Sequence, residues 1–266
     1  MSERATVQTT VTRIMASGEV HQRSDQLAAE EPLEIRIDGR PVAITMRTPG
    51  HDLELAAGFL YTEGVIDGLD DLGALAHVDD PAAPRGNTVD TVLAGGVPAG
   101  RRHLADRTMF ASSSCGVCGK ASIDRLMVDH PPLTKHLSPS AELLLSLPDR
   151  LRAAQALFAQ TGGLHAAALV RQDGTFEVVR EDIGRHNAVD KVIGWRLRAD
   201  AVPVSDRILL VSGRVGFEIV QKALVAQIPV IASIGAPSSM AVQLAEQAGQ
   251  ILVGFIKADR LNQYTG

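Results

Sequence analysis

Cysteine is nearly absent from the chain. The 266 residues include two cysteines, Cys115 and Cys118, and both lie in one short stretch. All thiol chemistry is therefore confined to that stretch. A structural zinc site uses four ligands, so a single cysteine pair would need histidines to complete it. A structural disulfide is disfavoured as well, because a bridge across two intervening residues closes almost no loop.

Aromatic residues, excess positive charge and long apolar runs are scarce too. Aromatics make up 3% of the residues, which argues against a base-stacking platform for single-stranded nucleic acid. The net charge of -5 argues against a general nucleic-acid binder. No apolar run reaches the length of a membrane span, and residues 1–20 lack the apolar core of a signal peptide. We therefore expect a cytoplasmic protein with neither nucleic acid nor membrane as a partner.

The two cysteines lie among serines and glycines over residues 112–120, a composition typical of a mobile loop rather than a buried segment. Apolar residues at helical spacing over 123–127 predict a helix that begins at Cys118 or Gly119. A helix N-terminus and the charge of Lys120 both favour the thiolate, which is the nucleophilic form of cysteine. The stretch therefore predicts a pair of activated cysteines. The alternative is that two cysteines meet there by chance.

The first part of the chain, residues 1–105, has the pattern of a small α+β subdomain. Alternating apolar residues on both sides of Asp38-Gly39 are typical of a β-hairpin. The predicted elements are a partly extended lead-in over 1–30, hairpin strands over 33–37 and 42–46, a helix over 52–63 and a strand over 88–93.

Residues 106–266 predict an α/β domain that carries the mobile cysteine loop. From residue 207 onward, nearly pure apolar runs alternate with helical patterns, and such strands are covered on both faces of a sheet. The predicted elements are a helix from Pro148 to Gln160, strands over 166–171 and 175–180, a helix that includes 189–197, strands over 208–212, 230–233 and 251–256, and helices over 216–226 and 238–248. The expected fold class is therefore α/β, layered around a largely parallel sheet.

Two glycine-bearing loops follow predicted strands of this sheet, at 212–216 and 233–238. In an open α/β sheet, ligands bind beyond the carboxyl ends of the strands. Backbone N–H groups around Gly213 and Gly235 suit phosphate oxygens, and Arg214 adds a cation. The alternative is an ordinary turn in which a serine caps the following helix.

A third polar segment, residues 181–191, surrounds Gly184 at a predicted strand-to-helix junction. It contains Arg185 and His186, and its density of charged and amide groups exceeds what a turn needs. These residues are therefore binding candidates. In the alternative interpretation an Asp or Asn of the segment caps the helix, while Arg185 and Lys191 are solvated.

Cations also gather in the C-terminal segment from Phe255 to Arg260, which ends the last predicted strand. The two cations are Lys257 and Arg260. A charged chain end is usually only solvated, so this remains the alternative to a ligand-binding role.

A metal-dependent deaminase is a further possibility to test. Zinc deaminases combine His-x-Glu with Pro-Cys-x-x-Cys, and the glutamate carries protons. In this chain Ala167 stands at the glutamate position of the half match that begins at His165, and Ser114 stands at the proline position. The histidine also follows the cysteines instead of preceding them. We therefore disfavour deaminase chemistry and expect His165 to be a structural residue near the site.

Five motifs, in this order, resemble those of the FdhD family of formate dehydrogenase accessory sulfurtransferases, and the resemblance covers most of the chain from about residue 32. The motifs are Ser-Ser-Cys115-Gly-Val-Cys118-Gly, Gly162-Gly163-Leu-His165-Ala-Ala, Glu181-Asp-Ile-Gly-Arg-His-Asn-Ala-Val-Asp-Lys191, Ser212-Gly-Arg-Val-Gly-Phe-Glu218 and Gly254-Phe-Ile-Lys257.

The resemblance implies a protein that accepts sulfane sulfur from a cysteine desulfurase as a persulfide. It passes the sulfur to the molybdenum (or tungsten) bis-guanine-dinucleotide cofactor, which GDP can mimic, before the cofactor enters formate dehydrogenase. A cytidine-deaminase-like fold and a homodimer are also implied. By position, Cys115 is the persulfide carrier with Cys118 as its neighbour. The cofactor-binding candidates are Phe255, Ile256, Lys257, Ala258, Asp259, Arg260, Gly184, Arg185, His186, Gly213, Arg214 and Gly235.

This chain departs from the family at one place. The family often has arginine where Lys257 stands, and glycines where Ala258 and Asp259 stand. The charge is kept, but a lysine lacks the planar pair of donors that grips a phosphate. Two other classes remain open: a cofactor chaperone whose cysteines only protect the metal site, and a thiol-disulfide oxidoreductase, although no clear thioredoxin-like unit precedes the cysteines.

Overall fold

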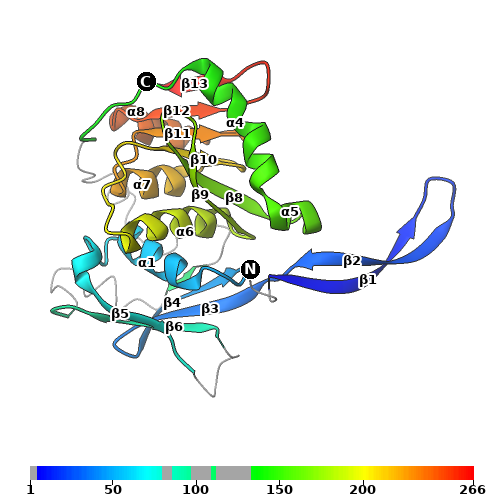
Figure 1. Ribbon diagram of the computed structural model, residues 1–266, viewed down its shortest axis with the longest axis horizontal. Helices are drawn as coiled ribbons and strands as arrows, with labels where there is room; N and C mark the ends of the chain where they lie inside the picture. Colours follow the sequence, from blue (N-terminus) through cyan, green and yellow to red (C-terminus); the bar gives the residue numbers. More distant parts are fainter. Residues whose placement is uncertain (1–4, 80–85, 97–108, 112–132) are drawn as a thin grey trace.

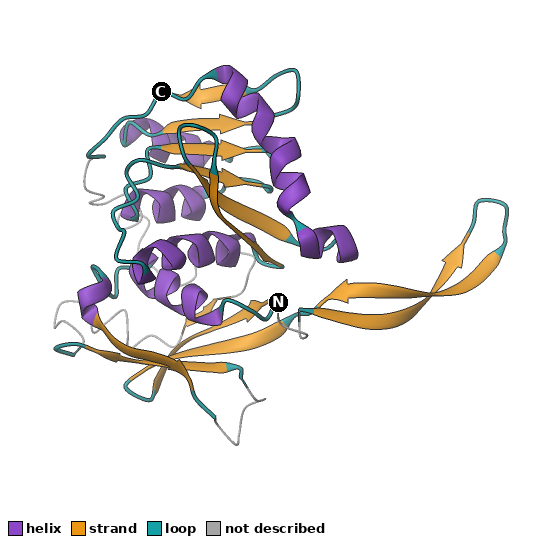
Figure 2. Cartoon of the chain, viewed as in Figure 1, coloured by secondary structure: helices purple, strands orange, loops and turns teal. Residues whose placement is uncertain are grey.

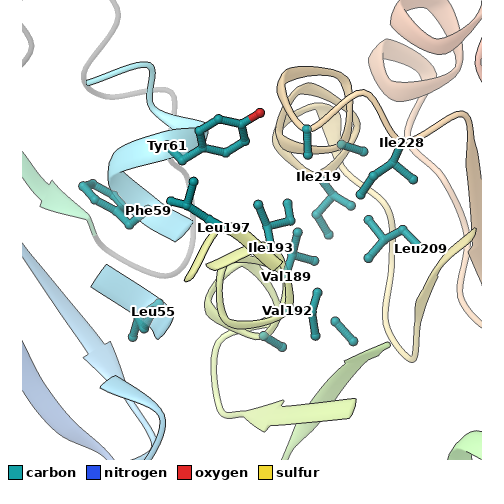
Figure 3. Close-up of a cluster of buried hydrophobic side chains, with 14 of the residues drawn as sticks. Leu55, Phe59, Tyr61, Val189, Val192, Ile193, Leu197, Leu209, Ile219 and Ile228 are labelled. Carbon is teal, nitrogen blue, oxygen red and sulfur yellow. The ribbon is translucent and has the colours of Figure 1, made fainter. Parts of the chain in front are cut away.

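The computed structural model describes residues 5–79, 86–96, 109–111 and 133–266. Two helices, α1 (Asp52–Thr62) and α6 (Arg185–Arg198), lie between a five-stranded and a six-stranded sheet (Figure 1). Their facing sides are apolar, and with helix α7 (Phe217–Val225) they form the main hydrophobic core (Figure 3). The core therefore joins the two sheets through helices rather than face to face.

The five-stranded sheet is built from the first part of the chain. Its strands lie in the order β5 (Leu72–His77), β6 (Thr88–Leu93), β3 (Glu31–Ile37), β4 (Arg40–Arg47) and β7 (Met109–Ala111). The predicted hairpin is confirmed: β3 and β4 are antiparallel, and the turn places Asp38 and Gly39 at φ 50° and 75°, as a two-residue hairpin turn requires. The sequence interpretation missed β5. The boundary placed near residue 105 stays a prediction, and β7 beyond it pairs with β4.

Residues 6–28 correct the expected lead-in. They form a long antiparallel hairpin of β1 (Thr6–Ile14) and β2 (Val20–Ala28), which projects from the body of the molecule (Figure 2). Both faces of the hairpin are largely exposed, so no alternation of apolar and polar residues marks its strands. We call this hairpin the arm.

The six-stranded sheet comes from the second part of the chain. Its order is β13 (Asn262–Thr265), β12 (Ile251–Gly254), β11 (Val230–Ser233), β10 (Ile208–Val211), β8 (His165–Val170) and β9 (Phe176–Asp182). Only β10, β11 and β12 are parallel to one another, and the remaining pairs are antiparallel. The expectation of a largely parallel sheet is therefore wrong: the parallel strands are confined to its middle.

Helices α7 and α8 (Ser239–Gln247) connect the parallel strands, as the apolar periodicity predicted. Most of the predicted helix from Pro148 to Gln160 is helical, but its predicted start is wrong and it is broken at Gln155. Helix α4 (Ala141–Ala154) begins at Ser140, whose side chain accepts a hydrogen bond from the Leu143 N–H, and Pro148 lies inside the helix. A separate short helix, α5 (Ala156–Thr161), follows and ends at Gly162 with φ 67°.

Helices α1 and α6 approach each other at two glycines. A Cβ on Gly58 would lie 1.9 Å from the Asp190 carbonyl oxygen, and one on Gly194 would lie 1.9 Å from the Glu54 carbonyl oxygen. The absence of side chains thus allows the backbones to touch. No helix among the described residues is long and apolar enough to cross a membrane.

Candidate functional site

Most of the residues singled out from the sequence meet at one edge of the six-stranded sheet. The parallel strands β10, β11 and β12 end there, and the antiparallel pairing brings the start of β8 to the same edge together with the end of β9. We call the residues that gather there the cationic edge: His165, Gly184, Arg185, His186, Gly213, Arg214 and Gly235.

The loops after β10 and β11 are in backbone contact. A Cβ on Gly235 would lie 2.7 Å from the Gly213 carbonyl oxygen and 2.8 Å from the Arg214 nitrogen. The Ser233 hydroxyl donates to the Gly213 carbonyl at 2.7 Å and accepts from the Gly235 N–H at 3.0 Å. Glycine is therefore required at Gly235 for packing, and the serine holds both loops in one shape.

His165 lies against the first of these loops. A Cβ on Gly213 would be 2.9 Å from its Nδ1 atom. Burial lowers the pKa of His165, and the positive charges of Arg185, His186 and Arg214 lower it further. Asp182 acts in the opposite direction, and the net effect of burial and of the nearby arginines favours the neutral form of His165. The expectation that His165 lies near the site is consistent with this arrangement.

His186 is held by a glutamate from the helix after β10. Its Nε2 atom lies 2.9 Å from Oε2 of Glu218, in the first turn of α7. Burial would raise the pKa of Glu218, but the hydrogen bond and charge of His186 outweigh it, together with the charges of Lys222 and Arg185, so that pKa is lowered. Glu218 is thus an anion in the first turn of α7 that orients His186 in the first turn of α6.

Arg185 and Arg214 are the two arginines of the cationic edge, and they differ in burial. The Nε atom of Arg185 is buried and has no hydrogen-bond partner among the described residues. Arg214 is exposed. A buried donor of a charged group without a partner is costly, so an anionic ligand at this position would relieve the cost.

The rest of the segment 181–191 has a different role. Lys191 is 1% exposed, its Nζ lies 2.7 Å from Asp182 Oδ2, and it donates to the Thr48 carbonyl at 2.9 Å. Asn187 donates to the carbonyl of Met46 at 2.7 Å and to Asp182 at 3.0 Å. The idea that Lys191 is solvated is therefore wrong: it ties α6 to the end of β4.

Two further groups of charged side chains connect α1 to β9, and α7 to α6 and α1. Arg180 on β9 binds the Glu54 carboxylate of α1 with two hydrogen bonds, of 2.6 and 2.8 Å. Lys222 on α7 lies 3.0 Å from Asp190 on α6 and donates to Thr62 on α1 at 2.9 Å.

The pKa values of these groups reflect both burial and pairing. Burial alone would raise the pKa of Glu54, but Arg180 and His51 outweigh it and lower that pKa to about 2. Burial alone would lower the pKa of Lys222, but Asp190 and Glu63 outweigh it and raise that pKa. We call the three groups of ion pairs the seam: Lys191 with Asp182, Thr48 and Asn187; Arg180 with Glu54; and Lys222 with Asp190 and Thr62.

The C-terminal segment from Phe255 to Arg260 begins at the same edge. The Phe255 N–H donates to the Gly235 carbonyl at 2.9 Å, and its side chain is 43% exposed at a φ of 51°. Ile256 is 1% exposed, so its side chain belongs to the core. Residues Lys257 to Arg260 are exposed and form a turn closed by a 2.8 Å bond between the Lys257 N–H and the Arg260 carbonyl.

A pocket of about 390 Å³ lies beside His165. Ser212 from the end of β10 and Ile234 from the end of β11 form one side of it. Arg152 and Phe158 form another, and the Arg152 guanidinium lies 4.2 Å from the centre of the Phe158 ring. The edge therefore combines cations and backbone N–H groups with an adjacent hollow.

Cys115 and Cys118 lie outside the described residues, so their hypothesised activation stays a prediction. Among the residues that are described, no group of three or more His, Cys, Asp or Glu side chains could hold a metal ion.

The sequence interpretation left out Ser212, Ser233 and Glu218 as site residues. Ser212 accepts a 2.9 Å hydrogen bond from the Ala166 N–H and so joins β8 to the loop after β10. A serine two residues before Gly235 and one directly before Gly213 were visible signals. No signal within the sequence pairs Glu218 with His186.

Three comparisons place the chain among known proteins. The model of the FdhD/NarQ family matches residues 28–266. A "Sulfur carrier protein FdhD" of Streptomyces avermitilis is 50% identical over 259 residues, covering 94% of this chain and 90% of that protein. The protein of the same name from Nocardia farcinica is 47% identical, covering 100% of this chain and 95% of the relative.

A solved structure has the same fold. A putative formate dehydrogenase accessory protein from Desulfotalea psychrophila superposes with a TM-score of 0.76 at 24% identity, over 98% of this chain and 97% of that one. The likeness of fold, the match over nearly the whole chain and the identity to two curated relatives agree with the motifs. The chain belongs to the FdhD/NarQ family.

Proposed function

We propose that the protein is a sulfur carrier that takes sulfane sulfur from a cysteine desulfurase on Cys115 and delivers it to the molybdenum (or tungsten) bis-guanine-dinucleotide cofactor for formate dehydrogenase. Relatives that share about half of its residues carry the name of sulfur carrier proteins. The cysteine pair in a serine- and glycine-rich stretch supplies the thiols. A cytidine-deaminase-like layering of the second sheet and its helices is part of the same proposal.

The cationic edge is the observation that carries the proposal. The acceptor has two pyrophosphates, and the edge offers cations with backbone N–H groups that open three helices, α6, α7 and α8. The fit can be tested on the buried Nε atom of Arg185, which lacks a partner among the described residues and suits a phosphate oxygen. Gly213 and Gly235 let the two loops and His165 pack closely, which brings the backbone N–H groups of both loops together.

Each side chain of the edge has a task in this proposal. Arg185 and Arg214 bind and orient the anionic part of the acceptor. Glu218 keeps His186 in place, and the neutral imidazole of His165 exchanges a proton at a nitrogen atom near the loop of Gly213. When bound, the acceptor supplies a metal centre that takes up sulfur.

The sulfur chemistry balances when the two thiols supply the electrons for transfer and cellular thiols restore them afterwards. The Cys115 thiolate attacks the outer sulfur of the donor persulfide; a new sulfur-sulfur bond forms on Cys115 as the donor's bond breaks, and the donor leaves as a thiolate. The Cys118 thiolate then attacks the inner sulfur of the Cys115 persulfide and releases hydrosulfide beside the acceptor. The two cysteines are oxidised to a disulfide while the outer sulfur is reduced by two electrons. Cellular thiols then reduce the disulfide.

The experiment is the intact mass of the protein after incubation with a cysteine desulfurase and cysteine. Wild type should gain the mass of one sulfur atom, which a reductant removes. Cys115→Ala should gain nothing, while Cys118→Ala should gain sulfur and release none to an acceptor. No gain in any variant would favour the cofactor chaperone instead, and insulin reduction by the wild type would favour the thiol-disulfide oxidoreductase.

A further inference from the structure

A second hollow, of about 590 Å³, lies between the end of α8 and strand β13, whose places are labelled in Figure 1. Gly249 and Gln250 line it and directly precede β12. It therefore lies at the amino ends of the parallel strands, whereas the cationic edge lies at their carboxyl ends. Its volume is within the range of small-molecule sites, about 300–1,000 Å³. We call it the β13 hollow.

Gln250 at the wall of the β13 hollow has an unmet hydrogen-bonding requirement. The residue is buried, and its Nε2 atom donates to the Ile228 carbonyl at 2.6 Å, which fixes the amide in place. Its Oε1 atom is buried and has no hydrogen-bond partner among the described residues. A buried acceptor without a donor is costly, so a ligand that donates a hydrogen bond here would relieve the cost.

The electrostatics of the β13 hollow favour a cation. Among the described residues that line it, Glu246 has the only charged side chain, and this carboxylate forms no ion pair with another described residue. Glu246 is exposed in the last turn of α8, and no basic residue stands in that turn. The C-terminal end of a helix carries partial negative charge, which adds to the charge of the carboxylate. A positively charged donor would therefore be attracted by all of these groups.

Strand β13 adds an aromatic ring and a further acceptor to the β13 hollow. Tyr264 lines the hollow and is 37% exposed, and the face of a tyrosine ring attracts cations. The Nε2 atom of Gln263 donates to the Gly266 carbonyl at 2.8 Å, which leaves the Oε1 atom of the same amide as an acceptor. A ligand of this hollow thus meets a carboxylate, two amide oxygens and an aromatic ring.

A guanidinium group matches this set of groups better than an ammonium group does. The guanidinium group is planar, carries its N–H donors in fixed directions, stacks on aromatic rings and binds a carboxylate with two parallel hydrogen bonds. An ammonium group is a compact point charge that is more strongly hydrated and has fewer donors. The guanidinium group can therefore contact the ring and donate to several oxygens at once.

We propose that the β13 hollow binds a guanidinium group, which donates hydrogen bonds to Glu246 and Gln250 and stacks on Tyr264. The group belongs either to an arginine side chain of a partner protein or to a free alkylguanidinium compound, and both sources present the same chemistry. The proposal does not rest on sulfur transfer, because no residue that sulfur transfer uses lines the hollow.

Titration calorimetry of the full chain with matched probes tests the chemistry of the ligand. Butylguanidinium and butylammonium differ only in the head group, and the chain should bind the first about tenfold more tightly. The peptide acetyl-Gly-Arg-Gly-amide distinguishes the two sources. Tighter binding of the peptide than of butylguanidinium indicates a partner protein, and the reverse indicates a free compound. Equal affinity for the two butyl probes, or no saturable binding of any guanidinium probe, would overturn the proposal.

Substitutions test the place of binding. Glu246→Gln should weaken the affinity for butylguanidinium about tenfold, because a charged hydrogen bond is lost. Glu142→Gln, on an exposed glutamate in the first turn of α4, removes the same charge elsewhere and should bind like the wild type. Gln250→Leu should also weaken binding, and urea unfolding checks that this buried substitution leaves the chain folded. Because Glu246 is exposed, its variant tests the site even if Gln250→Leu unfolds. Unchanged affinity of Glu246→Gln would contradict binding in the β13 hollow.

Discussion

The seam and the cationic edge use the same kinds of side chain, and both include residues of helix α6, yet they are opposite in character. In the seam, Lys191 is buried and makes bonds to Asp182 and Thr48. Arg185 begins the same helix, before Lys191, and lies at the edge. Its buried Nε atom has no hydrogen-bond partner among the described residues. Position on the helix therefore separates a residue that joins two sheets from one that is available to a ligand.

The difference shows how to interpret a dense polar motif. A high density of polar residues in a segment indicates that these residues have binding partners, but the partners can be other residues of the protein. The satisfied groups, Asp182, Asn187 and Lys191, are structural, whereas Arg185 and His186 face the edge. An unmet hydrogen-bonding requirement, such as that of the Arg185 Nε atom, therefore says more about a ligand than the number of charges does.

The largest expected effect is in the seam. Lys191→Met removes the cation beside Asp182 and leaves a buried carboxylate with no opposite charge, so the free energy of unfolding should fall by about 3–5 kcal/mol. Urea unfolding measures it. The control Lys257→Met, on an exposed residue, should change the unfolding free energy by less than about 0.5 kcal/mol. If both variants lost the same unfolding free energy, the seam would stabilise the fold no more than an exposed lysine does.

An intermediate effect is expected at the edge, on binding rather than stability. Arg185→Gln should weaken GDP binding about tenfold, because a charged hydrogen bond to phosphate is lost. Titration calorimetry measures the affinity, and urea unfolding should be nearly unchanged. Arg198→Gln, at the exposed far end of the same helix, is the control and should bind GDP like the wild type. If Arg185→Gln lowered stability and left GDP affinity intact, Arg185 would belong with the seam.

The smallest effect is the pH dependence of the Glu54–Arg180 pair. The pKa of Glu54 is lowered from 4.5 to about 2, so its ionised form stabilises the fold fully above 4.5, and this contribution is lost as the pH falls toward 2. Glu54→Gln should cost about 1 kcal/mol at pH 7, allowing for solvent screening. The difference in unfolding free energy between Glu54→Gln and the wild type should become smaller below about pH 4.5. Urea unfolding from pH 7 to pH 3 measures it.

The exposed Glu246→Gln serves as the control for that series. Its stability should run parallel to the wild type over the whole range. A gap between Glu54→Gln and wild type that stays constant down to pH 3 would mean that Arg180 does not hold Glu54 ionised.

Where a strand is buried on both faces, its sequence was sufficient to predict it. The apolar runs Ile208–Val211 and Val230–Ser233 mark β10 and β11, and Asp38-Gly39 marks the turn of the β3–β4 hairpin. The arm failed this test because both its faces meet solvent and leave no periodic pattern. Pro148 misled the interpretation of α4, since the helix begins at the cap of Ser140.

The site was predicted as far as strand topology allows. Ligand loops at strand ends predicted that Gly213, Arg214 and Gly235 would meet, and they do. The roles of Asp182 and Lys191 could not be predicted, because their partner Thr48 lies more than 130 residues away along the chain. Contacts of that range come from packing and leave no mark within the motif.

The contact of α1 with α6 at Gly58 and Gly194 has a consequence for motion. Helices whose backbones touch have no side-chain layer that could slide, so the two sheets should open together rather than separately. Backbone amides on both sides of this crossing should then exchange with deuterium only when the whole chain unfolds. The loops of the cationic edge are held in one shape by Ser233 and by the 3.0 Å hydrogen bond from the Val215 N–H to the Ala236 carbonyl. A ligand would therefore meet loops that keep their shape, on a base whose amides exchange slowly.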